Sequence, residues 1–138
     1  MGQALETVKQ FYKQFAANNW EGANACFGGD CKTVMPAGTM NVREHEAFGR
    51  SFKSALPDAH MEIVKTVESG EDLFVEGRFR GTHTAAMVTP QGTLPASGNK
   101  LDLPFADYFR VQNGKIVEHH VFYDQGTMMA QMGGGPPR

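Results

Sequence analysis

Two aspartates and a histidine near the end of the chain are residue types that can carry out acid–base chemistry. Asp107, His120 and Asp124 fall within residues 101–124, where apolar and polar side chains alternate. Alternation with period two is typical of β-strands and sends every second side chain to one face of a sheet. A carboxyl group set in an apolar wall has its pKa raised towards the range that a general base needs. We therefore predict that these three residues are catalytic.

A hairpin turn would position them. Asn113-Gly114 separates two alternating runs and favours the positive φ angles of a type I′ turn. Counting outward from this turn predicts the pairs Gln112 with Lys115, Val111 with Ile116, Phe109 with Glu118, Asp107 with His120, and Phe105 with Phe122. The same predicted face supplies the apolar floor of a pocket, with Leu103, Phe105, Phe109 and Phe122 as predicted substrate-binding residues.

A third strand is predicted over residues 71–84. The last residue on its apolar face is His83, which we also predict to bind substrate. The enolate oxygen formed by proton removal next to a carbonyl needs a hydrogen-bond donor. His120, His83 and Tyr123 are the candidates, although Tyr123 falls on the opposite strand parity. Alternatively, Asp107 only orients His120 and leaves Asp124 as the reacting group, or the pair satisfies itself without catalysis.

The composition excludes several classes of protein. The chain has 138 residues, a formal charge of -2 and no basic stripe for nucleic acid. No apolar run is long enough for a membrane helix, and the N-terminus does not resemble a signal peptide, so a cytoplasmic location is expected. We predict one domain over residues 1–132 and a disordered tail over 133–138. Cys26 and Cys31 have no second ligand pair, which favours reduced structural thiols over zinc binding.

Helical periodicity predicts helices over residues 4–17, 20–26 and 42–55, the last with Asn41 as its N-cap. Strands are expected over 31–35, 59–67 and 71–84, and a long loop over 85–100. Helices followed by long strands indicate an α+β domain with a mostly antiparallel sheet. The second face of the hairpin is also apolar, which predicts a homodimer with His119 at the interface.

The second half of the chain resembles a known family. The resemblance is carried by Gly81-Thr82-His83-Thr84, by residues 107–111 and 113–119, by Asp124-Gln125, and by Gln131-Met132-Gly133. These residues resemble the SnoaL-like polyketide cyclases, also labelled ester cyclases, of the nuclear transport factor 2-like (NTF2-like) superfamily. The resemblance implies a cone-shaped α+β fold in which about three helices pack over a curved sheet.

The resemblance also implies acid–base catalysis without metal or cofactor, by an aspartate on the last strands. Asp124 is the first match for that aspartate and Asp107 the second, whereas His120-Val121 stands where many members have Trp-Asp. The expected function is an aldol-type cyclase or isomerase acting on an apolar carbonyl compound. The alternatives are a non-catalytic ligand-binding or accessory domain, and an epoxide hydrolase.

Overall fold

The computed structural model describes residues 2–89 and 92–133. In chain order the elements are α1 (Gln3–Ala16), α2 (Trp20–Asn24), β1 (Phe27–Met35), β2 (Gly38–Met40), α3 (Val42–Ala55), β3 (His60–Ser69), β4 (Asp72–Thr82), β5 (Met87–Thr89), β6 (Gly92–Leu94), β7 (Lys100–Gln112), β8 (Lys115–Phe122) and α4 (Gln125–Gln131). The predicted tail beyond Gly133 lies outside the described residues.

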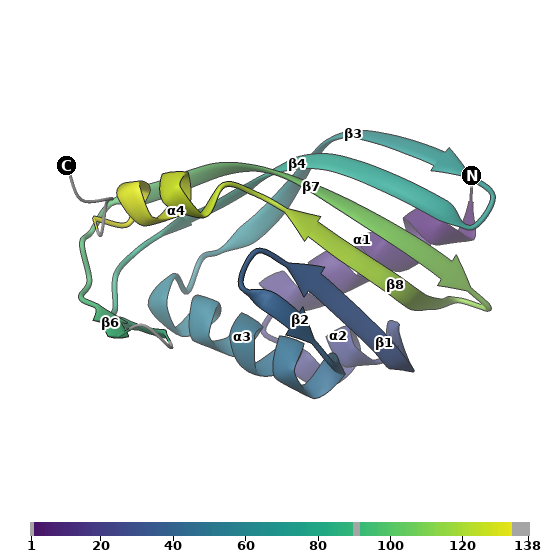
Figure 1. Cartoon of the computed structure of the whole chain (residues 1–138), viewed down its shortest axis with the longest axis horizontal. Helices are drawn as coiled ribbons and strands as arrows, with labels where there is room; N and C mark the ends of the chain where they lie inside the picture. The colour runs from purple at the N-terminus through teal and green to yellow at the C-terminus, as the bar shows by residue number, and fades with distance from the viewer. Residues whose placement is uncertain (1, 90–91, 134–138) are drawn as a thin grey trace.

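Six strands form one curved sheet in the order β2-β1-β8-β7-β4-β3. Only the β1–β8 pair is parallel, so the predicted mostly antiparallel α+β fold is confirmed. Figure 1 shows the sheet arching over α1 and α3, with α4 at one end. The described residues form four helices, where about three were expected. No described helix is long and apolar enough to span a membrane.

The concave face of the sheet holds the hydrophobic core. Along β7 every odd-numbered residue from Leu101 to Val111 is buried, as alternation predicts. Helix α1 packs Val8, Phe11 and Phe15 onto this face. Gly77 of β4 leaves room for the ring of Phe105 on the neighbouring strand, because a Cβ at position 77 would lie 2.6 Å from that ring. The aromatic side chains on this face therefore depend on packing from α1 and on the missing side chain at Gly77 of β4.

The local sequence signals for turns and helix ends are largely confirmed. Asn113 and Gly114 have φ angles of 53° and 74°, as a type I′ turn requires. Helix α3 has the predicted bounds, and Asn41 caps it by accepting from the Glu44 backbone N–H at 2.8 Å. The predicted loop over residues 85–100 is wrong in one respect, since β5 and β6 form a short antiparallel pair within it.

A β-bulge overturns three of the five predicted hairpin pairs. The pairs Gln112–Lys115 and Val111–Ile116 are confirmed, but the register then shifts and Arg110 pairs with Glu118. The observed pairs beyond the bulge are Phe109–His119, Tyr108–His120, Asp107–Val121 and Ala106–Phe122. One extra residue in β8 reverses which face its following side chains occupy. His119 therefore lies on the concave face, and His120 and Phe122 lie on the outer one.

Candidate functional site

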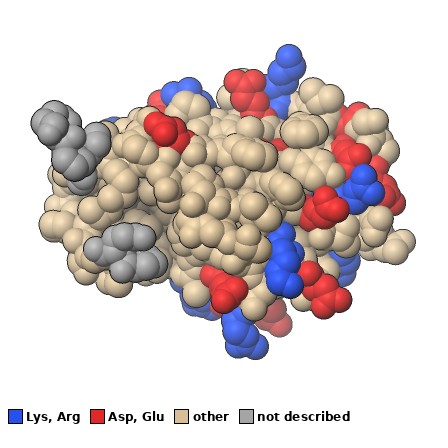
Figure 2. Space-filling view, viewed as in Figure 1, with Lys and Arg blue, Asp and Glu red and all other residues tan. Residues whose placement is uncertain are grey.

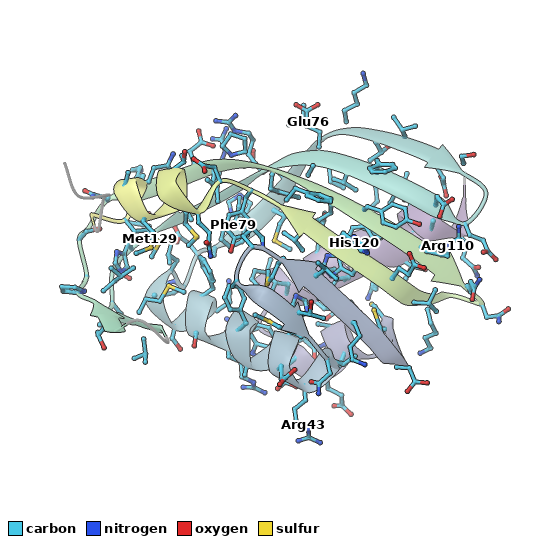
Figure 3. The ribbon with its side chains drawn as sticks, in the orientation of Figure 1. Arg43, Glu76, Phe79, Arg110, His120 and Met129 are labelled. Atoms are coloured by element: carbon cyan, nitrogen blue, oxygen red, sulfur yellow. The ribbon has the colours of Figure 1, made fainter. Side chains whose placement is uncertain are left out.

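An apolar cavity lies between the concave face of the sheet, α1 and α3. The space enclosed by its walls is about 640 Å³ with the open mouth included. Phe79, labelled in Figure 3, lies on this wall, where its ring centroid is 5.3 Å from that of Phe52. The polar side chains among the lining residues are His45, Asp107, His119 and Tyr123. The other lining residues are Phe11, Phe15, Met35, Phe48, Gly49, Phe52, Met61, Phe79, Leu103, Phe105, Val121 and Met128.

Asp107 is the carboxylate of this cavity and is only 4 % exposed. The Tyr12 hydroxyl donates to its Oδ2 at 2.6 Å, and Oδ1 is buried with no partner among the described residues. Burial raises the pKa of Tyr12 well above its usual value, and the Asp107 charge raises it further. Tyr12 thus remains a donor that holds one carboxylate oxygen and leaves the other for a ligand.

His119 is held next to Asp107 by contacts on two sides. Its Nδ1 lies 3.0 Å from Thr33 Oγ1, and its ring stacks on Phe109 at a centroid distance of 4.4 Å. Thr33 reaches it because β1 and β8 pair these two residues directly. The His119 Nε2 lies 3.7 Å from Asp107 Oδ2 and is itself buried without a hydrogen-bond partner in the described chain. The imidazole is therefore fixed in place with one nitrogen unpaired.

Tyr123 contributes a third unpaired polar atom. Its hydroxyl is buried and has no partner among the described residues. Burial raises the pKa of Tyr123 more than the neighbouring Gln125 side chain lowers it, so the phenol keeps its proton at neutral pH. Asp107 Oδ1, His119 Nε2 and the Tyr123 hydroxyl are thus a carboxylate oxygen, an imidazole nitrogen and a hydroxyl donor in one apolar cavity. Buried polar atoms without partners are costly, and a ligand with polar atoms would satisfy them.

His45 of α3 is a second imidazole in the cavity. Its ring centroid lies 5.4 Å from that of His119 and 5.6 Å from that of Phe27. Burial lowers the pKa of His45 to about 3, and His119 lowers it to a smaller extent. At neutral pH the His45 ring is therefore uncharged.

This shift predicts a pH dependence of stability. The unfolded state takes up a proton on His45 near its ordinary pKa of about 6.5, whereas the folded state does not until about pH 3. Stability contributed by His45 is thus complete above about pH 6.5 and lost as the pH falls towards 3. We expect His45→Gln to reduce the pH dependence of the free energy of unfolding by up to about 1.4 kcal/mol per pH unit in this window. Urea unfolding between about pH 4 and 7 measures it.

His60 provides a control of opposite sign. It is half-buried, and a hydrogen bond with the Asp58 backbone, together with a smaller contribution from one with Glu62, raises its pKa. Its stabilisation is present at low pH and is lost as the pH rises through the folded-state value. His60→Gln should therefore steepen the loss of stability on acidification. An unchanged pH dependence in His45→Gln would contradict the assigned burial of that ring.

The structure brings together only part of the predicted site. Asp107, Leu103 and Phe105 line the cavity as expected. The predicted pairing of His120 with Asp107 is wrong, because the bulge places His120 opposite Tyr108 on the outer face, and Phe122 there is 54 % exposed. Phe109 is fully buried under His119 and does not line the cavity.

Two further predicted residues lie away from the lining. His83 is fully buried and binds Ser97 Oγ through Nδ1 at 3.0 Å, which ties the end of β4 to the following loop. Asp124 is exposed and is the N-cap of α4, where it accepts from the Thr127 backbone N–H at 3.1 Å. Hydrogen bonds from Thr127 lower the pKa of Asp124. A carboxylate stabilised in this way is a weaker base than one in an apolar wall.

Sequence reasoning missed the roles of Tyr12, Thr33 and His45, and it placed His119 at a dimer interface. That placement is wrong, since His119 is 2 % exposed on the concave face. Among residues 2–89 and 92–133, no group of three or more His, Cys, Asp or Glu side chains is arranged to hold a metal ion. What the cavity offers is acid–base groups in an apolar surrounding.

A family model for the SnoaL-like domain matches residues 8–119. The chain belongs to the SnoaL-like domain family. No curated protein matches the chain at a significant level.

Solved structures similar to this SnoaL-like chain share its fold at low identity. The candidate polyketide cyclase IdmH from Streptomyces antibioticus is 23 % identical with a TM-score of 0.81, covering 96 % of this chain and 99 % of its own. The candidate hydroxylase AclR from Streptomyces galilaeus is 14 % identical with a TM-score of 0.81, covering 96 % and 97 %.

An NTF2-like protein of unknown function from Burkholderia pseudomallei is 23 % identical with a TM-score of 0.77, covering 96 % of this chain and 98 % of its own. The predicted NTF2-like fold is thereby confirmed. The names attached to these structures differ in chemistry, so the fold alone does not name a reaction.

Proposed function

We propose that this SnoaL-like protein is an acid–base enzyme of cyclase or isomerase type that acts on a mostly apolar carbonyl compound. The observation that carries the proposal is the set of unpaired buried atoms, Asp107 Oδ1, His119 Nε2 and the Tyr123 hydroxyl, in a cavity otherwise lined by apolar side chains. An apolar compound that places a carbonyl group beside these atoms matches both features of this site.

The chemistry requires no electron transfer and no added reactant. Asp107 Oδ1 takes a proton from the carbon next to the carbonyl, and the electrons of that C–H bond move to the carbonyl oxygen. The Tyr123 hydroxyl, and His119 through Nε2 when that atom carries a proton, donate hydrogen bonds to the enolate oxygen. If Asp107 returns the proton to another carbon, the product is an isomer. If the enolate carbon instead attacks a second carbonyl of the same compound, Asp107 returns the proton to the alkoxide oxygen that forms, and the product is a cyclised aldol.

Asp107 is the base in this proposal, in preference to Asp124. The Tyr12 hydrogen bond orients the Asp107 carboxylate at 2.6 Å and leaves Oδ1 unpaired. The cavity walls exclude water from it, which favours proton transfer from carbon. Asp124 accepts hydrogen bonds from Thr127 on the exposed end of α4 and is not among the lining residues.

A ligand-binding domain without catalysis is the second candidate, favoured by one position. Val121 lines the cavity, and it stands at the position where many of the SnoaL-like cyclases that this chain resembles carry an aspartate. A site with one carboxylate fewer has less acid–base capacity, yet it would still bind an apolar compound.

Deuterium exchange at carbon separates the two candidates. Ketones that raise the melting temperature would first be selected from aromatic polyketides, steroids and simple aryl ketones. Each would then be incubated with the protein in D₂O, and the signal of the protons next to the carbonyl followed by NMR. An enzyme exchanges these protons faster than buffer does. Binding without faster exchange would favour the ligand-binding domain.

We also propose that the protein forms a homodimer through the outer face of the sheet. Strand pairing places Val67, Phe74, Tyr108, His120 and Val34 in one row across that face. Of these, Val67, Phe74 and Val34 are 58 %, 52 % and 41 % exposed. An ion pair lies on each side of the row along the strands: Arg110 with Asp72 on one side, and Arg78 with Asp102 on the other. A second copy related by a two-fold axis would cover the apolar row without opposing like charges.

The dimer predicts that a charge in the apolar row gives a monomer. We expect Phe74→Asp to halve the mass measured by light scattering after gel filtration, because two buried carboxylates would face each other across the axis. Val88→Asp is the matched control, since Val88 of β5 is 69 % exposed but lies outside this sheet. A wild-type protein that is monomeric at micromolar concentration would refute the proposal.

A further inference from the structure

A groove adjoins the mouth of the cavity. It runs between the β1–β2 turn, the outer side of α3 and β5, and its empty volume of about 780 Å³ is at least that of the cavity. Its lining residues are Ala37, Gly38, Thr39, Met40, Glu44, Ala47, Phe48, Ser51, Met87 and Val88. Figure 2 shows that the charged side chains of this face gather at its edges and towards one end, away from the half that carries β6 and α4 in Figure 1.

Phe48 is the residue that the cavity and the groove share. It belongs to α3 and is only half-buried, and its ring lies 5.3 Å from that of Phe52 inside the cavity. Met35 lines the cavity, and Ala37 lines the groove two residues later in the chain. The two spaces are thus neighbours that share the Phe48 side chain as part of both walls.

We infer that the substrate is elongated and occupies both spaces, with its carbonyl beside Asp107 and an apolar chain passing Phe48 into the groove. This inference rests on the proposed function, because it takes the cavity as the place of reaction. It adds a substrate class: neutral ketones with an extended alkyl or aryl chain, too long for the cavity alone.

The groove lining sets the character of the chain that it accepts. Most of its side chains are apolar or small, and its one charged residue is Glu44. The Glu44 carboxylate accepts from the Asn41 backbone N–H at 2.9 Å and completes the capping box of α3. Among the residues that the structure describes, no lysine or arginine lines the groove, so a phosphate or carboxylate at the distal end of the ligand would lack a cationic partner among them. An uncharged hydrocarbon chain fits this lining.

Binding of phenyl alkyl ketones of increasing chain length tests the inference. The probes run from acetophenone to dodecanophenone, and their Kd values are measured by calorimetry. Each methylene that leaves water for an apolar groove contributes about a fourfold gain in affinity. We expect the wild-type affinity to keep rising for the long members. In Ala47→Trp, which fills the groove from α3, the long members should lose this gain while the short ones bind as before.

Two further variants control the experiment. Ala16→Trp places the same bulk at an exposed helical alanine outside both spaces and should bind the whole series like the wild type. Thr39→Trp fills the groove from its opposite wall and should repeat the result of Ala47→Trp, which guards against a folding defect in one variant. An equal chain-length dependence in the wild type and both filled variants would overturn the inference, as would an affinity that stops rising at short chains.

These outcomes differ from those that would overturn the proposed function. Affinity is measured without turnover. Affinity that rises with chain length, without faster proton exchange, would support the elongated ligand and refute the proposed enzyme activity. Faster proton exchange with short ketones, without any effect of chain length on affinity, would support the enzyme activity and refute the elongated ligand. Failure of every ketone in the series to bind would refute both.

Discussion

Asp107→Asn is expected to lower protein-catalysed proton exchange on a bound ketone by about two to four orders of magnitude, the usual effect of removing a positioned general base. The amide keeps the size of the carboxyl group and can still accept from Tyr12, whose hydroxyl lies 2.6 Å from Oδ2. Folding and ketone affinity should therefore change little. The measurement is the rate of deuterium incorporation by NMR, beside the Kd of the same ketone.

Asp124→Asn is the matched control for this result. The substitution is chemically identical, and asparagine is as good an N-cap as aspartate, so α4 should persist. Because Asp124 is exposed and binds Thr127, we expect the exchange rate of this variant to stay within a few-fold of the wild type. If Asp124→Asn lost as much exchange activity as Asp107→Asn, or if Asp107→Asn retained it, the choice of base would be wrong.

The parts of this site that could be predicted were those with local signals. Asn113-Gly114 specifies its turn because both residues readily take positive φ angles, and Asn41 with Glu44 specifies the start of α3. The alternation along β7 also placed Asp107, Leu103 and Phe105 correctly on the concave face. Each of these signals is complete within a few residues of chain.

The register beyond the turn could not be predicted in the same way. The bulge in β8 coincides with a register shift in the neighbouring pair, where Phe27 faces Ile116 but Lys32 faces Glu118. An ideal Cβ on Gly28, inside that irregular part of β1, would lie 3.6 Å from both the Ile116 carbonyl oxygen and the Val117 side chain. The extra residue is thus accommodated between two strands far apart in the chain, and parity counting within one hairpin does not detect it.

The partners that define the site are also distant in sequence. Tyr12 and Asp107 are 95 residues apart, and Thr33 and His119 are 86 apart. Helical periodicity places Tyr12 on the buried face of α1 but does not say which strand its hydroxyl will reach. The role of Asp124 did have a local signal, since an aspartate directly before a short helix is a common N-cap. The resemblance to the cyclases outweighed that signal in the sequence-based assignment.

The largest effect on stability is expected at Lys53, whose ammonium group is almost completely buried. Lys53 is 5 % exposed, and its Nζ donates to the backbone carbonyls of Ala16, Pro57 and Ala59 at 3.1, 2.8 and 2.9 Å. These bonds use all three ammonium donors and join the end of α1 to the segment between α3 and β3. Burial lowers the pKa of Lys53, and the Asp58 carboxylate raises it to a smaller extent.

Lys53→Met keeps the length of the apolar stem but leaves three carbonyl groups without their donor. A buried polar group that loses its partner costs about 1–3 kcal/mol; the bond to Ala59 is buried and the other two are part-buried, so the free energy of unfolding should fall by about 2–3 kcal/mol. Urea unfolding measures this loss directly, and the melting temperature should fall by on the order of 10 °C. Lys9→Met, at an exposed position of α1, removes the same charge and should change stability by less than about 0.5 kcal/mol. Equal stability of the two variants would mean that water replaces the ammonium at these carbonyls, and that α1 does not depend on Lys53 for its position.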